Sequence, residues 1–187
     1  MNTDIYFVRH AHSIYTPDEI NRPLSEKGRA DAIRVEGLLS KRNITNVISS
    51  PYQRAIGTVQ GVADEFELDI ELREDLRERL LSTEPVDDFA EAMNKVWSNP
   101  SIALEGGESN KEAQARGVRA VKSILKTYPG QSIVLGTHGN IMVLIMNYFD
   151  TQYDFSFWKR LDMPDIYKMS FNGGTLASTE RIWGQNQ

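Results

Sequence analysis

Four side chains able to bind or attack a phosphoryl group stand out in the sequence: Arg9, His10, Arg54 and His138. A guanidinium offers two parallel N–H donors to phosphoryl oxygens, and a neutral imidazole can act as a nucleophile. Two arginines and two histidines together would form an anion pocket that contains an attacking nitrogen. The chemistry that this set predicts is phosphoryl transfer, which depends mainly on positioning and on stabilisation of charge.

The predicted strands would bring these four side chains together. Each lies at the end of a strand or in the first turn of the helix that follows: strand 5–8 for Arg9 and His10, strand 46–50 for Arg54, and strand 132–135 for His138. The carboxyl ends of parallel strands meet at one edge of an open α/β sheet, and ligands bind there. We therefore expect the four side chains to converge.

The remaining apolar patterns complete an alternation of strands and helices. Helices are predicted over 25–43, 51–66, 89–97, 109–128 and 141–149, and further strands over 68–72, 166–171 and 175–182. Ser25 is the predicted N-cap of the first helix, and Ser109 with Glu112 forms a capping box. The pattern is typical of an α/β protein with a mainly parallel sheet, and the length of 187 residues fits one domain.

The composition narrows the range of partners. A formal net charge of -5 leaves no basic surface of the kind that nucleic acid needs, and no apolar run reaches the roughly 18 to 20 residues of a membrane span. The chain contains no cysteine, which excludes disulfides and thiolate chemistry. Since the first motif follows within ten residues of Met1, we expect no signal peptide and a cytoplasmic protein.

Two other interpretations of His10 stay open at this point. A histidine at a strand end often has only a structural hydrogen-bonding role. His10 and His12 also form an H-x-H pair, a spacing found in metal sites. Such sites need further Asp and His ligands, whereas Ser-Ile-Tyr follows at 13–15 and His138 is the remaining histidine. We therefore predict no metal and no other cofactor.

Six motifs, in order along the chain, resemble those of the histidine phosphatase superfamily in its phosphoglycerate-mutase-like branch. They are Arg-His-Ala-His-Ser at 9–13, Pro-Leu-Ser-Glu-Lys-Gly-Arg-Ala-Asp-Ala at 23–32, Ser-Ser-Pro-Tyr-Gln-Arg-Ala at 49–55, Leu-Arg-Glu at 76–78, Gly-Gly-Glu-Ser at 106–109 and Thr-His-Gly at 137–139. The resemblance implies a three-layer α/β/α sandwich with a mostly parallel central sheet. It also implies a single histidine phosphatase domain over 1–187, with a small lid-like insertion at about 80–106.

The resemblance also implies a role for each motif residue. His10 would attack phosphorus and become a phosphohistidine. Arg9, Arg54 and His138 would bind the phosphoryl oxygens during catalysis. Glu78 would protonate the leaving oxygen and then accept a proton from water.

Further residues are assigned by their place beside these motifs. Glu78 is chosen over Glu74 and Asp75 because the Leu-x-Glu pattern of the family falls on it. Ser13 either bonds to the phosphate or caps the loop. Arg22 joins the predicted substrate-binding residues from the loop that precedes the second motif.

Two residues depart from the family pattern. Ala11 replaces the usual glycine and adds a methyl group where the backbone would approach the phosphate, which a negative φ would tolerate. His12 stands where the family often has Glu or Gln. Its side chain either faces the substrate or has a structural role.

The resemblance implies a metal-independent phosphatase that acts on a small phosphorylated metabolite. A phosphoglycerate mutase and a phosphohistidine protein phosphatase are the alternatives within the superfamily. Mutases resembling the family carry larger insertions, whereas the interval from Glu78 to Gly106 holds one short predicted helix, which favours hydrolysis. A regulatory protein that only binds a phospho-ligand would lack one of His10, Arg54 and His138, and all three are present. The sequence makes no prediction of the oligomeric state.

Overall fold

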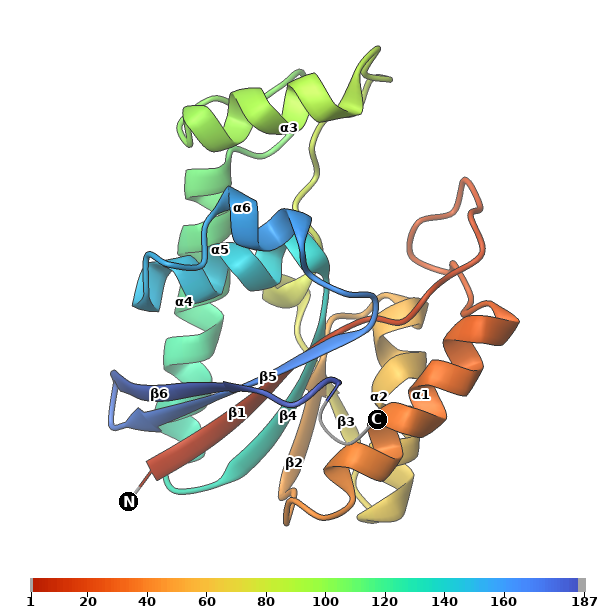
Figure 1. Ribbon diagram of the computed structural model, residues 1–187, viewed down its shortest axis with the longest axis vertical. Helices are drawn as coiled ribbons and strands as arrows, with labels where there is room; N and C mark the ends of the chain where they lie inside the picture. The colour runs from red at the N-terminus through yellow and green to blue at the C-terminus, as the bar shows by residue number, and fades with distance from the viewer. Residues whose placement is uncertain (1, 185–187) are drawn as a thin grey trace.

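A six-stranded sheet forms the centre of the computed structural model, which describes residues 2–184; residues 1 and 185–187 of the predicted domain lie outside that range (Figure 1). The strand order is β3-β2-β4-β1-β5-β6. The strands are β1 (Asn2–Arg9), β2 (Asn46–Ser49), β3 (Ile70–Leu72), β4 (Ser132–Thr137), β5 (Asp165–Asn172) and β6 (Thr175–Arg181). The first four are parallel to one another, β5 is antiparallel to β1, and β6 is antiparallel to β5. The predicted mostly parallel sheet is therefore confirmed.

Helices cover both faces of this sheet, as Figure 1 shows. One face carries α1 (Glu26–Leu39) and α2 (Gln53–Glu65), and the other carries α4 (Asn110–Thr127) and α5 (Gly139–Phe149). The short helices are η1 (Glu74–Leu76), α3 (Phe89–Ser98) and α6 (Phe155–Lys159), of which α3 lies beyond the carboxyl edge of the sheet. No helix within residues 2–184 is both long and apolar enough to cross a membrane.

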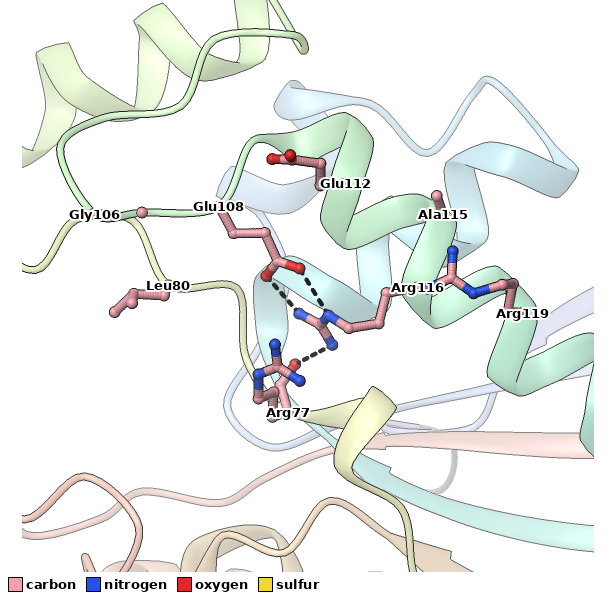
Figure 2. A pocket seen from close by; sticks show the side chains of 9 residues that line it. Arg77, Leu80, Gly106, Glu108, Glu112, Ala115, Arg116 and Arg119 are labelled. Atoms are coloured by element: carbon pink, nitrogen blue, oxygen red, sulfur yellow. Dashed lines mark hydrogen bonds and ion pairs between the residues drawn. The ribbon is translucent and has the colours of Figure 1, made fainter.

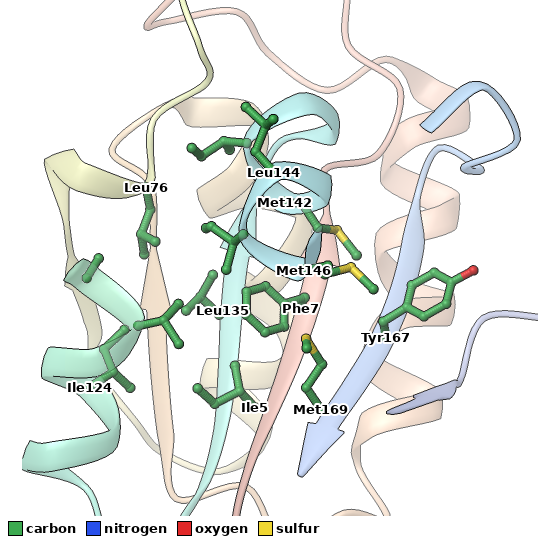
Figure 3. Packing of buried hydrophobic residues seen from close by; sticks show 14 of the residues in the cluster. Ile5, Phe7, Leu76, Ile124, Leu135, Met142, Leu144, Met146, Tyr167 and Met169 are labelled. Atoms are coloured by element: carbon green, nitrogen blue, oxygen red, sulfur yellow. The ribbon is translucent and has the colours of Figure 1, made fainter. Parts of the chain in front are cut away.

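The central strand β1 is apolar on both faces because helices cover both. Side chains alternate along a strand, so Ile5 and Phe7 face α4 and α5 while Tyr6 and Val8 face α1 and α2. Figure 3 shows Phe7 in the same buried apolar cluster as Met142 and Met146 of α5. This two-sided burial holds the carboxyl end of β1 in a fixed place.

The predicted helix starts agree with the structure within two residues, and the predicted end of the first helix is wrong. Ser25 caps α1 and accepts a hydrogen bond from the backbone N–H of Gly28, and the capping box of α4 is present. The first helix ends at Leu39 rather than near Asn43, which has a φ of 48° and turns the chain toward β2. The second helix begins two residues after Pro51. A short helix that the sequence patterns do not indicate, α6, begins after its N-cap Asp154.

The first turn of α1 lies directly against the loop that follows β1. A Cβ atom added at Gly28 would lie 2.0 Å from the carbonyl oxygen of His12. The same oxygen accepts a hydrogen bond of 3.0 Å from the backbone N–H of Ser25. The glycine of the 23–32 motif is therefore required by close packing, and it fixes the course of the chain beyond His10.

This close approach predicts opposite effects for two glycines of α1. Gly28→Ala is expected to lower the free energy of unfolding by about 1–3 kcal/mol, because the methyl group would collide with backbone. Gly37→Ala has no neighbouring atom within 4 Å of the new methyl group and is expected to raise it by about 0.5–1 kcal/mol. Urea unfolding of both variants measures the difference. A stabilising Gly28→Ala would contradict the packing described.

Candidate active site

Most of the predicted site residues surround one cavity at the carboxyl edge of β1 and β4. Its volume is about 410 Å³. Its lining residues are Arg9, His10, His12, Ser13, Arg22, Arg54, Glu78, Phe89, Gly139, Asn140, Trp158 and Met163. Seven of the residues singled out from the sequence are therefore brought together, and His138 lies behind them.

The two ring nitrogens of His10 have different partners. Nδ1 donates to the carbonyl oxygen of Ala11 at 2.8 Å, since a carbonyl can only accept. Nε2 accepts a hydrogen bond of 3.3 Å from Nε of Arg54. Both contacts require the same tautomer, with the proton on Nδ1 and a lone pair on Nε2.

The surroundings of His10 keep its ring uncharged. Burial, together with smaller effects of the guanidiniums of Arg54 and Arg9, lowers the pKa of His10 to about 3, against the opposing effect of the Ala11 carbonyl. The ring is 8% exposed. His10 therefore stays a neutral imidazole through the whole pH range in which most proteins are folded.

His138 lies behind His10 and is fully buried. The two ring centroids are 5.2 Å apart, and Nε2 of His138 is 2.7 Å from the hydroxyl oxygen of Ser50. Burial lowers the pKa of His138 well below its usual value, with smaller contributions from His10 and Arg54. Its Nδ1 atom has no hydrogen-bond partner among the residues described. A direct contact of His138 with a phosphoryl group stays a prediction, because its ring does not line the cavity.

Arg9 is fixed by the chain opposite it. Its Nη1 atom donates to the carbonyl oxygens of Leu161 at 2.8 Å and Asp162 at 3.0 Å. A Cβ atom added at Gly139 would lie 2.9 Å from Nε of Arg9. The glycine after His138 therefore leaves the space that this guanidinium occupies.

Arg54 and Arg22 share one acidic partner, Glu19. Nη1 of Arg54 donates to the Glu19 carbonyl oxygen at 2.7 Å, and Nη2 lies 3.3 Å from its carboxylate. Nη1 of Arg22 lies 2.7 Å from the same carboxylate. The sequence analysis missed Glu19, because it lies in an irregular loop with no periodicity to indicate its direction.

The carboxylate of Glu78 is held by the start of α5. Its Oε2 accepts from the backbone N–H of Asn140 at 3.0 Å, and its Oε1 from Ile141 and Arg79 at 2.9 Å each. Glu78 thus caps a helix whose own N-cap residue makes no side-chain cap bond. Because Oε2 accepts only one of these three bonds, it keeps room for a further partner.

The other two acidic candidates face away from the cavity. Glu74 and Asp75 belong to η1, are exposed and do not line the cavity. The geometry therefore favours Glu78 among the three, as the Leu-x-Glu pattern predicts.

Comparison with known proteins gives the family of this chain. A family model described as the histidine phosphatase superfamily, branch 1, matches residues 5–180. The chain belongs to this superfamily. A curated relative, phosphoglycerate mutase-like protein 4 of Arabidopsis thaliana, is 30% identical over 155 residues, which span 74% of this chain and 67% of the relative.

Solved structures agree with the fold. Phosphoserine phosphatase from Entamoeba histolytica, in complex with phosphoserine, has a TM-score of 0.80 at 19% identity, and the match covers 98% of both chains. A mycobacterial glucosyl-3-phosphoglycerate phosphatase has a TM-score of 0.78 at 20% identity, with 97% of both chains covered. These structures establish a shared fold, and the proteins to which this chain is similar are named as phosphatases and as mutases or mutase-like proteins.

The 106–109 motif of the superfamily has a structural task in this chain, which Figure 2 shows. The carboxylate of Glu108 accepts two hydrogen bonds from Arg116 of α4, at 2.8 and 2.7 Å. The remaining Arg116 nitrogen, Nη1, donates to the carbonyl oxygens of Asp75 at 2.7 Å and Arg77 at 3.1 Å. This clamp, beside a second cavity of about 530 Å³, fixes the segment that carries Glu78.

The two departures from the superfamily pattern fit the structure. Ala11 does not have a positive φ, and its N–H donates to Oγ1 of the buried Thr58 at 2.9 Å. His12 lines the cavity, and its Nδ1 lies 2.8 Å from the hydroxyl oxygen of Ser25. His10 and His12 thus have separate partners, and within residues 2–184 no group of three or more His, Cys, Asp or Glu side chains is placed to hold a metal ion.

His10 is expected to make folding stability depend on pH. The folded chain keeps this ring neutral down to about pH 3, whereas the unfolded chain takes up its proton near the ordinary value of 6.5. Above pH 6.5 the ring is neutral in both states and does not change the free energy of unfolding. As the pH falls from 6.5 toward 3, only the unfolded chain binds this proton, so the free energy of unfolding falls by up to about 1.4 kcal/mol per pH unit. Urea unfolding between pH 4 and 7 in phosphate-free buffer should show a smaller slope for His10→Asn than for the wild type. Equal slopes would mean that His10 is not held neutral.

Proposed function

We propose that this protein is a metal-independent phosphatase that hydrolyses small phosphomonoesters through a phosphohistidine on His10. The observation that carries the proposal is the tautomer of His10, whose Nε2 lone pair meets Arg54 at a cavity that Arg9 also lines. A neutral nucleophile between cationic donors is what attack on a phosphoryl group requires.

The first chemical step forms the phosphoenzyme. The guanidiniums of Arg9 and Arg54 bind the phosphoryl oxygens, and Nε2 of His10 attacks phosphorus in line with the leaving oxygen. As the P–O bond breaks, Glu78 gives its proton to that oxygen and the alcohol departs. The charge that develops on the equatorial oxygens is stabilised by the arginines.

The second step returns the enzyme to its starting state. Glu78, now ionised, accepts a proton from a water molecule whose oxygen attacks phosphorus. The N–P bond breaks, inorganic phosphate leaves, and His10 regains its lone pair. Ser13 and His138 are proposed as further donors to the phosphoryl oxygens. If the Ser50 hydroxyl donates to Nε2 of His138, the partnerless Nδ1 of His138 carries the proton for this purpose.

The short segment over the cavity favours hydrolysis over a mutase reaction, in which the phosphoryl group is transferred back to the substrate. Between Glu78 and the 106–109 motif the chain forms a single regular element, α3. We propose that the 80–106 segment acts as a small lid that still admits water. A mutase, by contrast, must exclude water from its phosphoenzyme.

Turnover of p-nitrophenyl phosphate in excess EDTA tests the proposal. The wild type should remain active, and His10→Ala should lose at least about 10³-fold in kcat, because the nucleophile is gone. Acid-labile, base-stable labelling from a ³²P-labelled substrate should appear in the wild type only. Activity that requires an added divalent metal would support a metal site instead, and transfer to a phosphoglycerate acceptor rather than to water would support a mutase. Phosphate binding without turnover would support a regulatory protein.

Two substrates that differ in the basicity of their leaving oxygen test the role of Glu78 as the acid. Glu78→Gln should lose about 10²–10⁴-fold on an alkyl phosphate, whose alkoxide must be protonated. On p-nitrophenyl phosphate the variant should still release one nitrophenolate per enzyme molecule in a rapid burst, followed by slow turnover. Nitrophenolate leaves without protonation, so only hydrolysis of the phosphoenzyme then needs Glu78. Stopped-flow absorbance measures the burst. Glu74→Gln, an exposed acid in the same segment, is the matched control and should behave as the wild type. An equal loss on both substrates, with no burst, would contradict this role.

A further inference from the structure

The mouth of the cavity has an apolar wall beside its phosphoryl-binding residues. Phe89 at the start of α3, Trp158 in α6 and Met163 beyond α6 all line it. Phe89 is 56% exposed and Met163 is 37% exposed. Large apolar side chains that distant segments bring together around a cavity usually contact a ligand. We call Phe89, Trp158 and Met163 the apolar wall.

Trp158 is held in place by a stack of three rings. Its indole stacks on Phe155 at 5.6 Å between centroids and 15° between planes, and Phe155 stacks on Trp97 of α3 at 5.5 Å and 21°. Trp97 also donates from Nε1 to the side-chain oxygen of Asn140, another lining residue, at 3.2 Å. The stack therefore joins α3, which carries Phe89, to α6 and fixes the position of Trp158.

The cavity offers little charge to a second anionic group on the substrate. Three guanidiniums line it within the described part of the chain. Those of Arg9 and Arg54 are assigned to the phosphoryl group, and that of Arg22 pairs with the carboxylate of Glu19 at 2.7 Å. A carboxylate on the leaving group would lose its hydration against the apolar wall. No cation of the cavity that is still without a partner would compensate for this loss.

We infer that the leaving group of the substrate is uncharged and carries a flat apolar ring, which the apolar wall selects. This inference rests on the proposed function and names its substrate class: monophosphates of ring-bearing alcohols. In the reaction the P–O bond to such an alcohol breaks, Glu78 protonates the alcohol oxygen, and His10 holds the phosphoryl group until water removes it as inorganic phosphate. Phosphoserine and phosphoglycerates, which carry a carboxylate, are disfavoured.

Two phosphates of primary alcohols make the comparison direct. 2-Phenylethyl phosphate and O-phosphoserine have similar leaving oxygens and differ in what the second carbon carries. The wild type should favour 2-phenylethyl phosphate by at least about tenfold in kcat/KM, the effect expected for burying one ring. Phe89→Ala and Trp158→Ala should each reduce this preference about tenfold, mainly through a higher KM, because the ring contacts the wall before and during the reaction.

A variant that adds a positive charge to the apolar wall and a control variant outside the cavity complete the test. Phe89→Arg should raise kcat/KM for phosphoserine while lowering it for 2-phenylethyl phosphate. Tyr148→Ala removes an exposed aromatic ring outside the cavity and should leave the ratio unchanged. A wild type that hydrolyses both substrates equally, or a Phe89→Ala variant with an unaltered ratio, would overturn the inference and leave the proposed function standing.

Failure of the proposed function would give a different result. If the wild type hydrolyses no phosphomonoester, calorimetric titration with 2-phenylethylphosphonate and with inorganic phosphate still tests the apolar wall. About tenfold tighter binding of the phosphonate, lost in Phe89→Ala, would support the inferred ligand class for a binding protein. Equal affinities would overturn it.

Discussion

The neutrality of the His10 ring is the constraint on which the rest of the site depends. A protonated imidazole could not share a buried edge of the sheet with two guanidiniums, and it would have no lone pair to attack with. Burial, the Ala11 carbonyl and the Arg54 N–H group all favour the same uncharged tautomer. The surrounding chain then limits the excess positive charge, since Glu19 pairs with Arg54 and backbone carbonyls hold Arg9.

Glu78, the proposed acid, is held both by direct contacts with its carboxylate and by contacts with the backbone that precedes it. The start of α5 holds the carboxylate of Glu78 directly, so the side chain that caps the helix also faces the cavity. Arg116 holds the backbone of the same segment through the carbonyl oxygens of Asp75 and Arg77, and Glu108 neutralises Arg116. Two motifs far apart in the sequence therefore form one support, and the geometry of Glu78 depends on both.

The sequence predicted the parts of this site that local rules determine. The places of His10 and His138 just after two strands follow from short apolar runs, and the start of α1 follows from the cap at Ser25. The links through Glu19 and Arg116 were not predictable in this way. Glu19 lies in a loop 35 residues before Arg54, and Arg116 of α4 reaches backbone carbonyl oxygens 39 and 41 residues away, separations that no periodicity records. The end of α1 was misplaced for a related reason: the turn at Asn43 begins only after the helix has ended.

The phosphoryl-binding and leaving-group parts of the cavity rest on different elements, and this division has a chemical consequence. Arg9, His10 and Arg54 follow from the sheet and its first helices, whereas the apolar wall comes from α3, α6 and the chain after it. In the proposed reaction, a change in the wall would therefore alter which alcohol fits without moving His10. Since the wall would contact the leaving group equally before and during bond breaking, it would act on binding, while we assign acceleration of the chemical step to the arginines and Glu78.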